Sequence, residues 1–81
     1  MLPLADVRAD QRGWTLDVLK VVRELGSEQF SLKDVYARQS HLAALHPNNH
    51  NIEPKIRQQL QVLRNMGFVD FVSPGQYHLI H

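Results

Sequence analysis

The sequence contains no cysteine, and this absence excludes two kinds of small protein. Neither a disulfide framework nor a zinc site with thiolate ligands can hold the chain together. Stability therefore has to come from an apolar core, which is thin in a chain of 81 residues. A protein without cysteine is compatible with a reducing compartment, and we expect a cytoplasmic location.

Long apolar runs are absent as well. No stretch approaches the roughly 20 residues of a membrane-spanning helix, so we expect no membrane partner. Residues 1–13 alternate acids and bases and lack the apolar segment of a signal peptide, so we expect none there. They also show no sustained period. We interpret them as a linker or N-terminal arm, followed by a single folded domain over residues 14–81.

Charge of one sign is not in large excess, because the formal net charge is only +1. A nearly neutral chain gives no support to strong nonspecific polyanion binding. The distribution is more informative. Acids and bases are balanced up to residue 34, whereas bases outnumber acids after it, which favours the second half as the place where a polyanion docks. The bases of that half are Arg38, Lys55, Arg57 and Arg64.

The first amphipathic segment predicts a helix from Trp14 or Thr15 to Leu25. Thr15 is the expected N-cap, and Gly26 follows the last turn, where a left-handed residue is common. Apolar residues recur at helical spacing, so we expect one face of this helix to be buried. That face comprises Leu16, Leu19, Val22 and Leu25, with Val18 beside it.

The middle of the chain predicts a short strand and a second helix. Residues 28–32 alternate polar and apolar side chains, as a brief strand does. Ser31 and Asp34 have the spacing of a capping box, with Asp in place of Glu or Gln, and predict a helix over residues 32–45. Pro47 then ends it. Its expected inward residues are Val35, Leu42 and Leu45.

A polar loop over residues 46–51 leads to a third predicted helix, which Asn51 caps and which ends at Met66. At about 100° per residue, the apolar residues of this helix share one face and polar residues occupy the other. Lys55 lies on the flank. The apolar face comprises Ile52, Ile56, Leu60, Leu63 and Met66, and the opposite face comprises Pro54, Arg57, Gln58, Gln61, Arg64 and Asn65.

The last segment predicts a hairpin with strands over residues 68–72 and 77–80. Pro74 and Gly75 occupy the central positions of the turn, as in a type II turn. The predicted fold class is therefore mainly α with a small β wing: a winged helix-turn-helix with three helices, a short strand and a C-terminal β-hairpin. The expected core is Leu16, Leu19, Val22, Phe30, Leu32, Val35, Leu42, Ile56, Leu60, Leu63, Val69, Phe71, Tyr77 and Leu79.

In a winged helix the third helix enters the major groove of DNA by its N-terminal half. Gln can bond adenine in a bidentate way, and Arg can bond guanine or a phosphate. We expect Lys55 and the loop over residues 48–51 to hold phosphates, and Arg57, Gln58 and Gln61 to face the groove. The candidate DNA-binding residues are Asn48, Asn49, His50, Asn51, Pro54, Lys55, Arg57, Gln58, Gln61 and Arg64, with Ser73, Gln76 and His78 in the wing.

Two other interpretations of these residues stay open. A polar helix face is also typical of a solvated surface, and Arg57 and Arg64 could pair with Glu53 or Asp70. His46 and His50 are four residues apart, but Pro47 interrupts any shared helix, so we expect no metal site. The sequence contains no nucleophile elbow and no Gly-rich phosphate loop. We therefore expect neither catalysis nor a cofactor.

Five blocks of the sequence occur in the same order as in a known family, at residues 13–19, 30–36, 46–49, 55–64 and 75–79. They resemble the C-terminal winged-helix domain of the DpnI-like, or Dam-replacing, restriction endonucleases. The resemblance implies a reader of double-stranded DNA that is fused to a nuclease domain. In DpnI the winged helix senses N6-methyladenine in a GATC context.

The wing departs from the pattern of this family. There an Arg often flanks the turn glycine and another follows the Tyr, whereas Pro74, Gln76 and His78 occupy that stretch here. We therefore expect weaker phosphate contacts from the wing.

The expected function is a sequence-specific DNA-binding module that reads N6-methyladenine in the major groove and targets a restriction-type bacterial nuclease. Ile52 and Pro54, with His50 beside them, are the candidate contacts for the methyl group. In the alternative interpretation of these two residues, Ile52 packs in the core and Pro54 only starts the helix. The alternative function is a protein–protein interaction or transcription-regulator domain without methyl preference.

Overall fold

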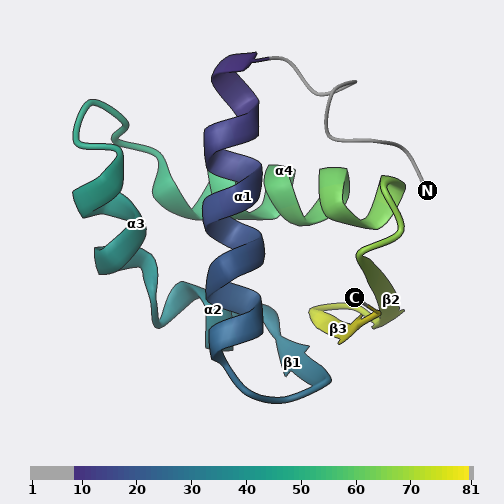
Figure 1. Ribbon diagram of the computed structural model, residues 1–81. Helices are drawn as coiled ribbons and strands as arrows, with labels where there is room; N and C mark the ends of the chain where they lie inside the picture. The colour runs from purple at the N-terminus through teal and green to yellow at the C-terminus, as the bar shows by residue number, and fades with distance from the viewer. Residues whose placement is uncertain (1–8, 81) are drawn as a thin grey trace.

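The computed structural model describes residues 9–80 and the side chains from Gly13 onward. It shows a mostly helical domain in which a three-stranded antiparallel sheet closes one end (Figure 1). No helix in the described range is long and apolar enough to cross a membrane. The predicted fold class is confirmed. The elements are α1 (Ala9–Glu24), β1 (Gln29–Ser31), α2 (Leu32–Tyr36), α3 (Gln39–Leu45), α4 (Ile52–Asn65), β2 (Val69–Ser73) and β3 (Gln76–Leu79).

The hairpin and the short strand form one sheet in the order β1-β3-β2. Tyr77 on the central strand lies opposite Phe30 on one side and Phe71 on the other. Gly75 has a φ of 74°, as the third position of a type II turn requires. The Leu32 N–H donates to the carbonyl of Gly75 at 2.9 Å, which joins the turn to the start of α2. The turn of the hairpin is therefore held against the start of α2.

The core lies between α1, α4 and the inner face of the sheet. Side chains from four elements, Val18, Val35, Leu60 and Val69 among them, are essentially inaccessible to solvent there. As Figure 1 shows, α1 crosses α4, and the two helices pack against each other. The buried residues form one cluster, so all elements of this small domain depend on the same core. Most of the predicted core residues are confirmed.

The predicted burial is wrong for two residues of the expected core, and also for a third residue that was expected to face inward. Leu16 is 47% exposed because it lies about 160° around α1 from Val18, which faces the core. Phe71 is 42% exposed because β2 is an edge strand of the sheet. Leu45, in the last turn of α3, is also exposed. Leu32 and Leu79 are only partly buried and pack against the core from its rim.

The first helix begins earlier than predicted. It starts at Ala9, so the described part of the predicted arm, up to Gly13, is helical. Thr15 is therefore not an N-cap but a fully buried residue inside the helix. Gly13 costs a helix about 1 kcal/mol, which the burial of Trp14 directly after it can offset. Residues 1–8 lie outside the described residues, so an arm there stays a prediction.

The predicted second helix is two helices. The capping box of Ser31 and Asp34 is confirmed and starts α2. The helix then tightens, because the Arg38 N–H bonds the carbonyl of Val35, three residues back. Arg38 itself leaves the helical region at φ −102° and ψ 11°, and the chain turns before α3 starts. The periodicity of the side chains continues across this break, which is why the sequence predicts one helix.

Candidate nucleic-acid interface

Helix α4 has the division into two faces that the sequence predicts. Ile56, Leu60 and Leu63 are fully buried. Arg57, Gln58, Gln61 and Arg64 are exposed, as is Pro54. The helix follows directly on α3, so its outward face is the polar surface of the second helix of a helix-turn-helix. This surface carries five of the candidate DNA-binding residues.

One flank of this surface is hollowed at the start of α4. The hollow has a volume of about 500 Å³ and is lined by Asn49, Asn51, Pro54, Lys55 and Gln58. The side chain of Asn49 accepts a hydrogen bond from the Asn51 N–H at 3.0 Å, which fixes the turn before the helix. Asn51 occupies the N-cap position, but its side chain makes no capping hydrogen bond, so the predicted capping role is wrong. The structure thus brings five of the candidate residues together.

The other flank of the surface carries Arg57 and Arg64. Neither forms an ion pair with a carboxylate of the described side chains. Glu53 instead accepts a hydrogen bond from Gln39 at 3.1 Å, and Asp70 accepts one from the Phe71 N–H at 3.0 Å. The alternative pairing of the two arginines with these acids is therefore wrong. Both cations remain available to an anionic ligand.

The wing residues are not gathered in one place. Ser73 and Gln76 are exposed and lie opposite each other where the hairpin turns. His78 lies on the outer face of the sheet, since its neighbour Tyr77 faces the core. Its Nε2 is 3.9 Å from a carboxylate oxygen of Glu28. An acid beside His78 makes this face a poor surface for phosphates.

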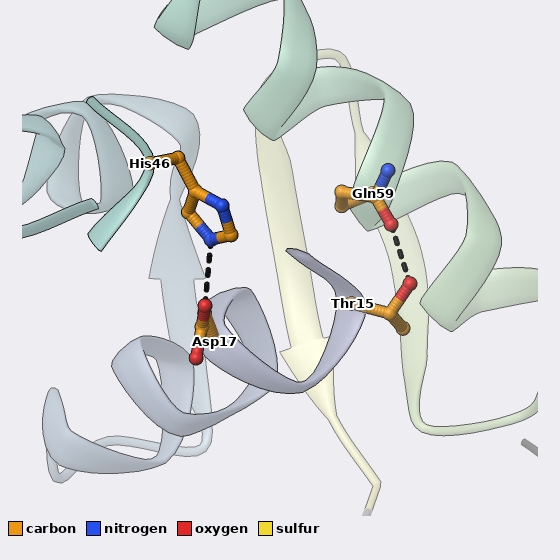
Figure 2. Close-up of polar contacts among 4 residues, drawn as sticks. All are labelled: Thr15, Asp17, His46 and Gln59. Atoms are coloured by element: carbon orange, nitrogen blue, oxygen red, sulfur yellow. Dashed lines mark hydrogen bonds and ion pairs between the residues drawn. The ribbon is translucent and has the colours of Figure 1, made fainter. Parts of the chain in front are cut away.

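The loop before α4 is anchored to α1 by His46. Its Nε2 lies 2.7 Å from Oδ2 of Asp17 (Figure 2). Its ring also stacks on Trp14 with centroids 4.0 Å apart. The sequence does not predict this anchor, because its partner is 29 positions away and no local pattern connects the two. Among the described residues, no three potential metal ligands gather, here or elsewhere.

The buried face of α4 contains one polar residue that the sequence reasoning missed. The Thr15 hydroxyl donates to Oε1 of Gln59 at 2.5 Å, and both residues are fully buried (Figure 2). Nε2 of Gln59 has no hydrogen-bond partner. This pair joins the middle of α1 to the middle of α4. It therefore helps to fix the orientation of α4 relative to α1, and with it the direction of the outward face of α4.

Arg57 also influences the sheet. Burial raises the pKa of Tyr77, and the nearby Tyr36 raises it further, whereas the positive charge of Arg57 acts in the opposite direction.

The family model described as the Dam-replacing HTH domain, of the DpnI C-terminal type, matches residues 10–79. The chain belongs to this family. The resemblance seen in the sequence is thereby confirmed, and the chain is a helix-turn-helix domain, which is a DNA-binding module. In this Dam-replacing HTH domain, α4 is the second helix of that motif.

Proposed function

We propose that this domain binds double-stranded DNA with the N-terminal half of α4 in the major groove and prefers DNA that contains N6-methyladenine. The observation that carries the docking is the outward face of α4, on which exposed amides stand beside cations without ion-pair partners. Gln and Arg are the side chains that bond base edges best in that groove. The hollow at the start of the helix adds a place beside these side chains where an anion can lie.

The proposed contacts fall into two kinds. Lys55 and the loop over residues 48–51 hold phosphates: Lys55, Asn49 and Asn51 line the hollow at the start of α4, where the helix dipole favours an anion. Arg57, Gln58 and Gln61 read bases. The Gln61 amide nitrogen already donates to Oδ1 of Asn65 at 3.3 Å. This bond occupies the amide nitrogen and leaves the Gln61 carbonyl oxygen to accept from the N6 group of adenine.

The methyl preference rests on Pro54. A methyl on adenine N6 projects into the major groove and needs an apolar neighbour there. Ile52 is partly buried and packs against the core, which removes it from the two candidates. Pro54 is exposed and lines the hollow with Gln58. Burying one methyl group is worth about 0.8 kcal/mol, or roughly a fourfold gain in affinity for each mark.

The biological setting follows from the family. We propose that the domain targets a restriction-type nuclease to GATC-like sites in the bacterial cytoplasm and that cleavage belongs to a separate domain. A protein-interaction or regulatory domain is the second candidate, favoured by exposed apolar residues on and after the hairpin. These are Phe71, Val72 and Ile80.

Fluorescence anisotropy with three GATC duplexes tests the proposal. The duplexes are unmethylated, hemimethylated and fully methylated, and each is titrated at one salt concentration and then at increasing salt. We expect affinity to fall as salt rises, because phosphate contacts release counterions, and to rise about fourfold with each methyl group. Equal affinity for all three duplexes rejects the methyl preference alone. Absence of binding at about 50 mM salt rejects DNA binding and favours the second candidate.

Substitutions test the two kinds of contact. Gln58→Ala and Gln61→Ala should each cost about 1–3 kcal/mol of binding and relax sequence preference. Lys55→Ala should instead weaken all duplexes alike and lower the salt slope by about 0.9. Gln29→Ala is the matched control, because Gln29 is exposed and lies on the outer face of the sheet. If both α4 glutamines can be removed without effect, this docking is wrong.

A further inference from the structure

Phe71 is a large aromatic residue whose position the core does not explain. It is 42% exposed on an edge strand, although its partner on the central strand, Tyr77, is buried. The guanidinium carbon of Arg64 lies 4.4 Å from the centroid of its ring. This is well within the range of a cation–π contact, which reaches about 6 Å. A cation from α4 therefore lies over part of the Phe71 ring, and the rest of the ring is exposed.

The ring beneath Arg64 is itself fixed. Phe71 contacts Tyr77 edge to face, with centroids 5.0 Å apart. Tyr77 in turn stacks on Phe30 at 5.3 Å. A ladder of aromatic rings thus runs across all three strands and ends under Arg64. A flexible side chain at the end of α4 therefore rests on a rigid base.

The stacked arrangement leaves the polar edge of Arg64 available. A guanidinium that lies on an aromatic ring keeps its N–H groups directed outward, in the plane that suits a phosphate. No carboxylate of the described side chains forms an ion pair with it. Arg64 lies in the last turn of α4, whereas bases are read by the first half of such a helix. Its position therefore favours the DNA backbone over a base.

We propose that Arg64 binds a backbone phosphate of duplex DNA and that Phe71 is the positioning residue that holds it there. The proposal rests on the proposed function, since it assumes that α4 enters the major groove. It assigns the wing a role that does not depend on basic residues at its tip. The wing orients a phosphate contact of the recognition helix through the aromatic ladder.

A mixed-sequence duplex is a suitable probe, because a phosphate contact acts on all sequences. Arg64→Gln should weaken binding and lower the salt slope by about 0.9. Phe71→Leu, which keeps apolar volume but removes the ring, should weaken binding about two- to fivefold. Phe71→Trp should restore affinity, because Trp supports cation–π contacts best. Val72→Ala is the control, as a neighbouring exposed residue on the same strand.

The two positions should also be coupled. In an Arg64→Gln background, Phe71→Leu should have no further effect on affinity, because the side chain it positions is absent. Thermal unfolding of each variant establishes that it is folded at the temperature of the titration. Unchanged affinity of the Phe71→Leu variant overturns the proposal, as does a loss that persists in the Arg64→Gln background. If the unaltered domain binds no duplex, the proposed function falls as well.

Discussion

Tyr77 is a buried phenol at the centre of the sheet, between two other aromatic rings. Desolvation penalises its charged form most, so its pKa lies above the ordinary value of 10.0. Arg57 lowers this pKa and Tyr36 raises it. The pKa of Tyr77 therefore depends both on its burial and on the charge of Arg57, an arginine that we expect to face DNA.

Stability should fall at alkaline pH because of Tyr77. Its pKa is higher in the folded state than in the unfolded state, so its contribution to the unfolding free energy is fully present below pH 10.0. That contribution is lost as the pH rises through the folded value. Urea unfolding of the Tyr77→Phe variant should show a smaller loss of unfolding free energy at alkaline pH than the unaltered domain.

The Arg57→Gln substitution should raise the pKa of Tyr77 further, because it removes the positive charge that lowers this pKa. Tyrosinate absorbance measures the shift. A decrease of the pKa would contradict this effect of Arg57.

Between α1 and α4 the decisive contact is polar. The Thr15–Gln59 pair lies in an otherwise apolar interface, where a buried polar group is stable only with a partner. No pattern in either helix predicts it, because its two residues are 44 positions apart. The extent and the exposed face of α4, in contrast, follow from local periodicity and agree with the sequence. Local signals therefore suffice for this helix but not for its register against α1.

Removing the Thr15 hydroxyl should destabilise the domain more than removing both polar groups. Thr15→Val leaves the Gln59 amide buried without that hydrogen bond, which costs about 1–3 kcal/mol. Adding Gln59→Leu should recover part of this loss, because it also removes the unpartnered Nε2. Urea denaturation of both single variants and the double variant gives the coupling free energy. Thr15→Ser, which keeps the hydroxyl, is the control. Strictly additive effects would show that the two side chains do not interact.

Across the whole molecule, the sequence predicts what repeats locally and misses what depends on contacts between distant segments. The capping box, the type II turn and the two faces of α4 carry their own signals. The early start of α1 is missed because Gly13 is commonly a helix breaker. The anchoring of His46 to Asp17 is missed because it joins two elements. The hollow of the candidate interface likewise forms only when loop and helix are placed together.

One shared core implies that a single truncation should affect the entire fold. Leu60 is fully buried in the cluster that joins all elements, whereas Leu16, on the neighbouring helix, is 47% exposed. Leu60→Ala should cost about 2–5 kcal/mol of unfolding free energy, against about 5–15 kcal/mol for a whole domain. Leu16→Ala should cost no more than about 0.5 kcal/mol, as exposed substitutions usually do. Urea unfolding followed by circular dichroism and by Trp14 fluorescence should give coincident transitions for both variants, because the domain unfolds as a unit. Equal losses for the two leucines would contradict the rotation of α1 described above, and separate transitions would contradict the single core.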